Sequence, residues 1–500
     1  MNSWLFLLLA SPLLFVAGYR FRIVRLLGYV LILTALLAMG IAGLVDKISL
    51  FFSAVALSVA VPVGLYAEEY VSEKLLPRNF VLLIDLFSWC IAATFVAPNI
   101  LTLAVLWTVA ELIGFALISM GSEDTRYSRA AGRFLLVSVL TFELSVFTLV
   151  FTSMFVMAAT VAGGQEVWRS LTAEFSELAS IRSVAPAWAV PLLVIGFVTK
   201  MALVPLHFWL PDAHSIAPAP ASAILSGVMT SMGLYALLRV WETVSLSAPV
   251  FTGMLVIQGF LSVVYASLMA AAQTNIKRIL AYSTIMHCGV MALLAALLPY
   301  SGAAVKILAL YALFHGISKA QLFVNTGSVY ILTNTIDVHR LGYLARTNPE
   351  LYRATILGAS SFMALPPTLG FAVKALLIYV AFEVMSRGGI YSLLFLLAVA
   401  ISSVFGIVYV VKYIGIYVGS LKEPRRPTIR LPSTLVFAEQ VLGWSVVALV
   451  PLVMTIMVNW FVNLLMLIYL VSAALLIYSL YIKAPRVVPF DDVWLGGVAP

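Results

Sequence analysis

The chain has 500 residues, of which 63% are hydrophobic and only 10% are charged, and its mean hydropathy is +1.08. Soluble globular domains carry about 25% charged residues, so this composition excludes a water-soluble protein and predicts a polytopic membrane protein. The formal net charge of +8 is explained by arginines that flank membrane spans on one side, and no nucleic-acid partner is expected.

Hydrophobic runs long enough to cross a bilayer, about 20 residues each, follow one another along the chain. The first run, from Trp4 to Ala17, has no basic flank and no A-x-A-like cleavage site, so we expect a first span and not a signal peptide. The sequence predicts an all-α fold with about 14 to 15 transmembrane helices. The predicted runs are 3–19, 22–44, 48–67, 79–97, 99–120, 130–158, 186–209, 219–239, 249–271, 276–298, 304–333, 353–384, 389–418, 434–457 and 460–482.

Basic residues gather in alternate loops between these runs. Roughly seventeen lysines and arginines, among them Arg20, Arg22 and Arg25, fall in the odd-numbered loops, against about five in the others. The positive-inside rule therefore predicts an outer amino terminus in a multi-pass protein of the cell membrane. Arginines at the ends of spans are interpreted as topology signals, because a guanidinium can reach the headgroups from there.

A lysine and a helix break coincide in the stretch from Phe197 to Arg239. Lys200 lies within an apolar run, and four prolines follow it, at positions 205, 211, 218 and 220. An unbroken membrane helix accommodates neither feature easily, and an ionisable side chain near the bilayer centre must find water or a partner. The stretch is therefore a candidate functional site.

A second apolar run shows the same combination. Pro366, Pro367 and Gly370 interrupt residues 353–384, and Lys374 stands one turn beyond the interruption. Five spans separate the two broken helices, so they should cross the membrane in opposite directions, as in inverted-repeat transporters. We predict N-terminal helices in 1–78, a first five-helix repeat in 79–240, a second, inverted repeat in 249–419, and C-terminal helices with a short tail in 434–500.

Glu111 lies about half-way along its span, with no basic residue in the same helix. A buried carboxylate keeps its charge at least cost beside a cation from another helix, and Lys200 is the candidate. Because a buried lysine loses its proton readily, such a pair suits proton transfer. The alternative is a static ion pair, or a protonated glutamic acid, that merely joins two helices.

His315 and Lys319 lie four residues apart in one span and therefore share a helix face, where they can pass a proton or share a water molecule. His287 is a further candidate, and His207 flanks the first proline break and could line an access path. For any single histidine the alternative is a hydrogen-bonded core residue. No carboxylate joins the histidines at metal-ligand spacing, so no metal site is expected.

The chain lacks the motifs of a redox or nucleotide enzyme. Its two cysteines, Cys90 and Cys288, are far apart in sequence and exclude a four-cysteine iron–sulfur motif, and no phosphate-binding loop is present. We therefore expect no cofactor in this chain and no active centre of its own. The driving force for transport should come from partner subunits.

Several of these stretches resemble the antiporter-like membrane subunits of respiratory complex I, membrane-bound hydrogenases, sulfur reductases and Mrp cation/proton antiporters. The matching segments are AELIGFALIS, TKMALVPLHFWLPDAHSIAPAPASAILSGVMTSMGLYALLR, QTNIKRILAYSTIMHCG, FHGISKAQLFVNTGS and LPPTLGFAVKALLI. The resemblance implies about fourteen spans with inverted five-helix repeats. It also implies that Glu111 and Lys200 form the input pair, that Lys374 is the lysine of the second broken helix, and that His315 and Lys319 lie on a polar axis between them.

One position departs from the family pattern. Where many members carry a lysine or histidine before MGLYALLR, this chain has Ser231. A serine hydroxyl can relay a proton through water but cannot store one near neutral pH. A water wire or a neighbouring histidine would have to take the place of that proton-binding residue, or the subunit would serve mainly as a scaffold.

The sequence thus predicts a subunit of a multisubunit redox-driven pump that translocates H+ or exchanges it for Na+. Its expected partners are other antiporter-like membrane subunits and a peripheral redox module, as in an oxidoreductase complex of the hydrogenase, sulfur reductase or NADH dehydrogenase type. One alternative is a non-conducting scaffold subunit of the same kind of complex. Another is a stand-alone solute carrier, which would need solute-matching groups at mid-membrane.

Overall fold

The computed structural model describes residues 3–19, 21–121, 125–158, 171–175, 177–178, 183–419, 431–456 and 460–479. The described part is almost entirely helical, as predicted. The elements are α1 (Ser3–Ala17), α2 (Arg22–Ile41), α3 (Lys47–Lys74), α4 (Asn79–Phe95), α5 (Ile100–Ser119), α6 (Thr125–Ala158), β1 (Ser183–Val184), η1 (Ala187–Ala189), α9 (Val190–Lys200), α10 (Trp209–Ile216), α11 (Ala219–Ile224), η2 (Leu225–Met229), α12 (Thr230–Thr243), β2 (Val244–Ser245), α13 (Ala248–Ala272), α14 (Ile276–Ala295), α15 (Ala303–Thr333), η3 (Val338–Arg340), α16 (Leu344–Thr347), α17 (Pro349–Phe362), α18 (Leu369–Gly388), α19 (Ile390–Val418), α20 (Ser433–Ala448), α21 (Val450–Ile456) and α22 (Trp460–Ile477).

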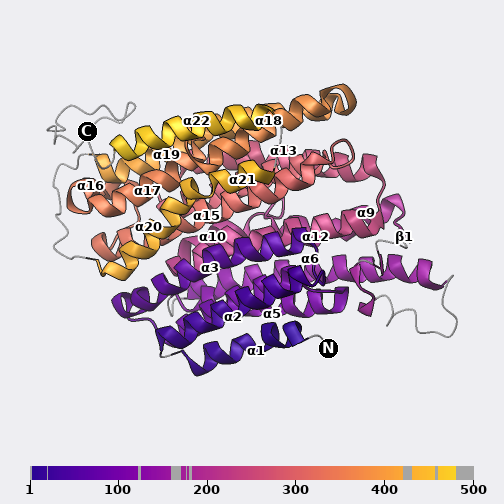
Figure 1. Ribbon diagram of the computed structural model, residues 1–500, viewed down its shortest axis with the longest axis horizontal. Coiled ribbons are helices and arrows are strands. Elements are labelled where there is room, and N and C mark those ends of the chain that lie inside the picture. The colour runs from indigo at the N-terminus through magenta and orange to yellow at the C-terminus, as the bar shows by residue number, and fades with distance from the viewer. Residues whose placement is uncertain are drawn as a thin grey trace.

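The helices run roughly side by side, with α1 and α2 at one edge of the molecule, α19 and α22 at the opposite edge and α15 between them (Figure 1). Among the described residues, 11 helices are long and apolar enough to cross a membrane, and four shorter apolar helices accompany them. Each of these helices overlaps one predicted run. The chain is a multi-pass membrane protein.

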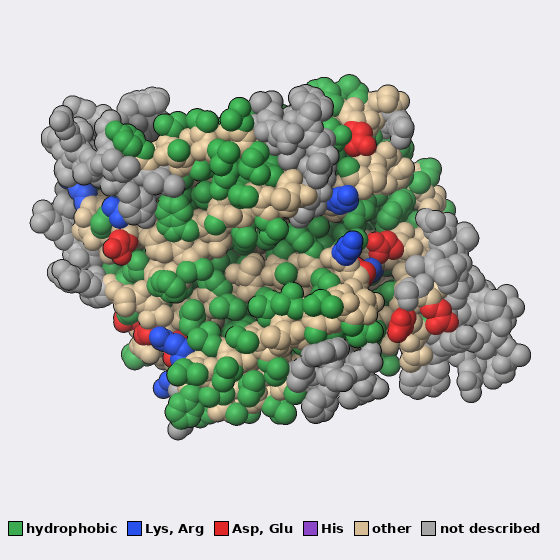
Figure 2. All heavy atoms as spheres, viewed as in Figure 1, with side chains coloured by type: hydrophobic (Ala, Val, Ile, Leu, Met, Phe, Trp, Pro, Cys, Tyr) green, Lys and Arg blue, Asp and Glu red, His purple; other side chains and the backbone are tan. Residues whose placement is uncertain are grey.

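The surface supports this conclusion. The face shown in Figure 2 is covered mainly by hydrophobic side chains, and its lysine, arginine, aspartate and glutamate side chains lie towards the two ends of the helices. An uncharged band of this kind suits lipid tails, whereas charged groups suit the headgroup regions. The tail after residue 479, part of the predicted segment 434–500, lies outside the described residues.

Both predicted helix breaks are present. Helix α9 ends at Lys200, and α10 begins at Trp209 after a turn in which Ala202 takes a left-handed φ of 54°. Helix α17 ends at Phe362, and α18 begins at Leu369 after a turn in which Ala364 has φ 57°. Pro205 in the first turn, and Pro366 and Pro367 in the second, lack the backbone N–H that would continue the helix.

The long helix α15 forms the centre of the bundle. The most apolar window of α15, like that of the continuous stretch from α11 to α12, is buried at every position. At Gly227 and Gly316, η2 and α15 approach backbone to backbone, since a Cβ added to either glycine would lie 2.8 Å from the carbonyl oxygen of the other. This close crossing joins the continuous stretch from α11 to α12 to the central helix α15.

Candidate functional site

The structure brings Glu111 and Lys200 together in the interior. Helix α5 supplies Glu111 and α9 supplies Lys200, and the ammonium Nζ lies 2.6 Å from Oε1 of the carboxylate. Their side chains are 0% and 1% exposed, respectively. The predicted contact is confirmed. Because both charges are removed from water, the loss of either partner would leave the other uncompensated.

Two further donors converge on the same carboxylate oxygen. The indole Nε1 of Trp107 donates to Glu111 Oε1 at 2.9 Å, and the Ser138 hydroxyl donates to it at 2.6 Å. The other oxygen, Oε2, has no hydrogen-bond partner among the described residues. The Trp107 ring is held in place by stacking on Phe142, with 4.4 Å between ring centroids. Sequence analysis missed both donors, although Trp107 lies four residues before Glu111 and shares its helix face.

Lys200 sits at the very end of α9, where the first break begins. The carbonyl end of a helix carries partial negative charge, which favours an ammonium there. The Trp209 indole, from the other side of the break, donates to the Thr199 carbonyl at 3.1 Å and closes the turn. The Phe134 ring also faces the lysine, with 5.2 Å between Nζ and the ring centroid. The break therefore positions Lys200 beside Glu111.

A second centre lies on α14 and α15. Lys319 Nζ donates to the Ser283 hydroxyl and, at 3.2 Å, to the Leu280 carbonyl. His315 is on the same helix and its ring centroid is 5.7 Å from that of His287. Neither ring nitrogen of His315 has a partner in the part of the chain that the structure describes. The three predicted residues His287, His315 and Lys319 thus gather in one buried cluster.

Hydroxyl groups of two tyrosines complete this centre. His287 Nδ1 lies 2.6 Å from the Tyr311 hydroxyl, and its Nε2 lies 3.3 Å from the Tyr409 hydroxyl. A histidine with a hydroxyl at each nitrogen can accept a proton on one side and donate on the other. The arrangement is suited to proton transfer, whereas a histidine packed only by apolar groups would not be.

Lys374 reaches the same region through the second break. Its Nζ donates to the carbonyl oxygen of Phe362 at 3.0 Å. The Phe362 ring faces Lys319, with 4.5 Å from Nζ to the ring centroid, and lies 4.9 Å from the ring of His287. Phe362 therefore contacts both Lys374 and the central cluster.

His207 lies apart from both centres. It is partly exposed, its ring packs edge-on against Tyr265 at 4.8 Å, and no hydrogen bond joins it to Lys200 or His315.

The hydroxyls of Ser226 on η2 and Thr284 on α14 are 2.7 Å apart. Over the described ranges, no unbroken series of protein hydrogen bonds connects the Lys200 pair with the Lys319 cluster. No group of three metal-ligating side chains was found among the described residues.

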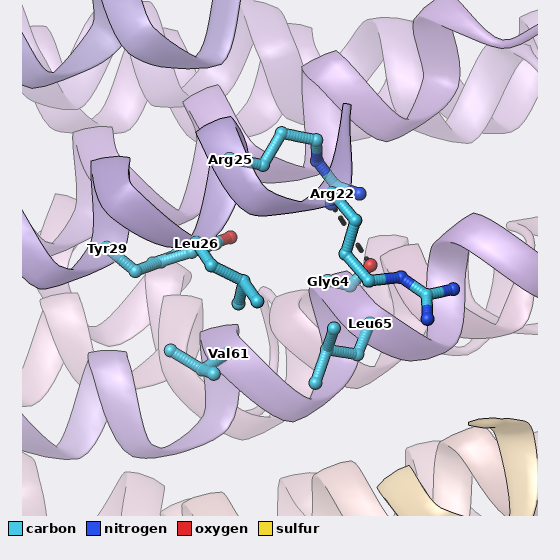
Figure 3. A pocket seen from close by; sticks show the side chains of 7 residues that line it. All are labelled: Arg22, Arg25, Leu26, Tyr29, Val61, Gly64 and Leu65. Carbon is cyan, nitrogen blue, oxygen red and sulfur yellow. Dashed lines mark hydrogen bonds between the residues drawn. The ribbon is translucent and has the colours of Figure 1, made fainter. Parts of the chain in front are cut away.

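One arginine was interpreted wrongly from the sequence. Arg25 was assigned to a loop as a topology signal, but it lies within α2 and its side chain is only 4% exposed. Its guanidinium donates to both oxygens of Asp85 on α4, at 2.5 and 3.0 Å, and to the Gly64 carbonyl at 3.1 Å. The Tyr29 hydroxyl donates to Asp85 at 2.7 Å. Figure 3 shows Arg25 and Tyr29 beside the small pocket between α2 and α3.

The sequence is similar to those of known proteins. The sequence profile of the transmembrane part of the NADH:quinone oxidoreductase/Mrp antiporter family matches residues 97–406. NAD(P)H-quinone oxidoreductase chain 4 3 of Trichormus variabilis is 34% identical over 63% of this chain and 56% of its own length. Chain 4 2 of Microcystis aeruginosa is 32% identical over 59% of this chain and 52% of its own length. The matched region spans about half the length of these curated relatives.

A solved structure has the same fold. A chain of respiratory complex I from Thermus thermophilus superposes with a TM-score of 0.66 and 25% sequence identity. The superposition covers 89% of this chain and 96% of the other. The similarity therefore extends over nearly all of both chains, beyond the region that the family profile matches.

Proposed function

Since the chain belongs to the NADH:quinone oxidoreductase/Mrp antiporter family, we propose that it is a proton-translocating membrane subunit of a multisubunit redox-driven pump. The observation that carries the proposal is the fully buried pair of Glu111 and Lys200 at a helix break. The curated relatives named above are chains of NAD(P)H-quinone oxidoreductases, which supports partners of two kinds: other antiporter-like membrane subunits and a peripheral redox module.

In this mechanism the Glu111 carboxylate holds the proton on Lys200. Attraction between charges falls steeply with distance in a medium of low dielectric constant, so a displacement of one or two ångströms would weaken it strongly. An ammonium that loses its carboxylate partner in a dry site gives up its proton readily. The Oε2 atom of Glu111 has no hydrogen-bond partner among the described residues and can therefore accept a proton or a hydrogen bond.

The released proton passes to the central cluster. The Ser226 hydroxyl on η2 contacts the Thr284 hydroxyl on α14, the helix that also carries Ser283 and His287, and water molecules would bridge the remaining gaps between the two centres. His315 and Lys319 receive the proton, His287 exchanges it with the hydroxyls at its two nitrogens, and Lys374 delivers it beyond the second break. The same path would serve a subunit that exchanges H+ for Na+, in which case pumping would depend on Na+.

We also propose that residues 79–240 and 249–419 form two inverted five-helix repeats. In its support, each segment contains one broken helix with a lysine next to the break, Lys200 in the first and Lys374 in the second. The lysine precedes the break in the first helix and follows it in the second.

Replacement of Lys200 by alanine in the assembled complex tests the proposal. Coupled proton pumping, measured in proteoliposomes with the redox reaction running, should be abolished. Lys412→Ala is the matched control, because Lys412 also lies within a helix but, among the described residues, donates only to the Ala271 carbonyl, and it should leave pumping intact. Full proton flux in the assembled Lys200→Ala complex would overturn the assignment.

A scaffold role is the second candidate, and Ser231 favours it, because a serine replaces the basic residue that the family pattern places there. Lys374→Ala separates the two roles. A conducting subunit should lose proton uptake with this variant, whereas a scaffold should be indifferent to it, provided that assembly of the complex is confirmed by native gel electrophoresis.

A further inference from the structure

A second carboxyl group is buried near the central cluster, and the mechanism above does not use it. Glu439 on α20 has no exposed surface. Its Oε2 accepts a hydrogen bond from Asn325 Nδ2 at 3.0 Å, and its Oε1 accepts one from the Ser328 hydroxyl. No lysine, arginine or histidine among the described residues forms an ion pair with it. In this respect it differs from Glu111 and Asp85, which both face a cation.

A carboxyl group without a cation in the membrane interior is most stable in its protonated form, because its charge would be neither solvated nor neutralised. The neutral group must then donate its proton to an acceptor. Ser328 can serve, because its hydroxyl lies between Glu439 Oε1 and the Tyr66 hydroxyl, 3.0 Å away. Rotation of two hydroxyl groups therefore satisfies both the charged and the neutral form, without displacement of any side chain.

A series of tyrosines on α19 connects Glu439 with the central cluster. Tyr409, Tyr413 and Tyr417 are fully buried and recur every four residues, so they share one helix face. The Tyr409 hydroxyl contacts His287, the Tyr413 hydroxyl donates to Asn325 Oδ1 at 2.8 Å, and the Tyr417 hydroxyl accepts from Asn325 Nδ2 at 2.6 Å. The Cβ atoms of residues four apart on a helix lie about 5–6 Å from one another, and a water molecule would bridge the hydroxyls of Tyr409 and Tyr413.

The Glu439 group lies between the central cluster and one end of the bundle. Asn325 follows Lys319 by six residues on α15, or about 9 Å along the helix axis. Beyond it, at the end of α15, Lys74 of α3 lies over the Tyr330 ring at 3.7 Å and donates to the Tyr330 carbonyl. Two neighbouring helices add hydroxyl groups near Glu439. Tyr66 of α3 contacts Ser328, and Thr355 of α17 donates to the Tyr417 hydroxyl.

We propose that Glu439 is a second proton-binding carboxyl group, which exchanges protons between the His287 and Lys319 cluster and the aqueous phase at the Thr333 end of α15. The path runs along Tyr409 and Tyr413 to the Asn325 amide, which contacts both Glu439 and Tyr417. This proposal rests on the proposed function for its direction of transport, but the protonation of Glu439 can be tested without any pumping.

Infrared spectroscopy of the full chain in lipid tests the protonation directly. Wild-type protein at neutral pH should show a carboxylic C=O stretching band that shifts in D2O and is lost in Glu439→Gln. Glu383→Gln is the control, because Glu383 is an exposed carboxylate that accepts from Ser301 and should contribute no such band at neutral pH. An unchanged band in a folded Glu439→Gln protein would overturn the proposal.

Proton pumping by the assembled complex tests the path. Glu439→Gln preserves the shape of the side chain, and we expect it to slow pumping by at least about tenfold, as for loss of a positioned acid–base group. Ser328→Ala keeps the carboxyl group but removes the hydroxyl that serves both of its forms, and it should also slow pumping. Normal pumping in both variants, while Lys200→Ala is inactive, would refute the role of Glu439 and leave the proposed function standing. Normal pumping in Lys200→Ala would instead refute the proposed function.

Discussion

Trp107 lies one helical turn before Glu111 on α5, and its indole N–H donates a hydrogen bond to the carboxylate oxygen that also contacts Lys200. The tryptophan thereby fixes the orientation of the carboxylate, and the ion pair does not depend on Lys200 alone. Three donors, from α5, α6 and α9, therefore converge on one oxygen of Glu111 and fix its position.

Trp107→Phe should loosen this pair. The variant keeps an aromatic ring beside Phe142 but removes one hydrogen bond, so we expect a loss of about 1 kcal/mol in the free energy of unfolding and reduced coupling of proton pumping. Unfolding in mixed micelles and pumping in proteoliposomes measure the two effects. Trp444→Phe is the control, since the Trp444 indole donates to the neutral amide of Gln440 at the same four-residue spacing. Equal coupling in both variants would speak against a role for Trp107.

Arg25→Leu should destabilise the fold strongly. It leaves Asp85 buried without its cation, which costs about 3–5 kcal/mol when one partner of a buried pair is removed. The double variant Arg25→Leu/Asp85→Leu should recover most of this loss. Arg22→Ala is the control: the Arg22 side chain is 40% exposed, and its pairs should contribute at most about 1 kcal/mol. Thermal unfolding in detergent provides the measurement, and similar midpoints for Arg25→Leu and Arg22→Ala would contradict the expectation.

Gly227→Ala should disturb the crossing of η2 and α15. The added methyl group would lie 2.8 Å from the Gly316 carbonyl oxygen, and overpacking of this kind costs about 1–3 kcal/mol. Gly253→Ala on α13 is matched to it, because a Cβ added there has no neighbour within 4 Å. The control should be as stable as the native chain or slightly more stable. The yield of assembled protein and its unfolding midpoint distinguish the two variants, and equal values would disprove the tight crossing.

Ser231→Ala should reduce pumping without loss of stability. The Ser231 hydroxyl is buried and has no hydrogen-bond partner among the described residues, so its removal costs no protein contact. If the hydroxyl holds a relay water, pumping should fall by at least about tenfold. Ser267→Ala removes another buried hydroxyl without a described partner, on α13, and should leave pumping unchanged. Unchanged pumping in Ser231→Ala would favour the scaffold role.

The sequence was most informative where a charged residue interrupts an apolar run. Lys200, Lys319 and Lys374 were found in this way, and the Glu111 contact followed from the cost of burying a lone carboxylate. The proline-rich breaks were equally clear, because proline cannot continue the hydrogen-bond pattern of a helix.

Contacts between helices distant in sequence could not be predicted so well. No sequence pattern indicated a role for Glu439, since its hydrogen-bond donors, Asn325 and Ser328, lie more than a hundred residues away on α15. Arg25 was misassigned because its position near a span end resembles that of a surface arginine, and only the packing of α2 on α4 shows its buried partner Asp85. Uncharged donors such as Ser138 resemble many other serines until the helices are placed.

Phe362 contacts two buried lysines of different helices: its carbonyl oxygen accepts a hydrogen bond from Lys374, and its ring faces Lys319. Phe362 is fully buried at the end of α17, so close packing carries its ring and its carbonyl group together when that helix end moves. A twist of the last turn of α17 would therefore change the surroundings of Lys374 and of Lys319 at the same time. Phe362 alone would then couple the two lysines, and no conformational change elsewhere in the bundle would be needed to do so.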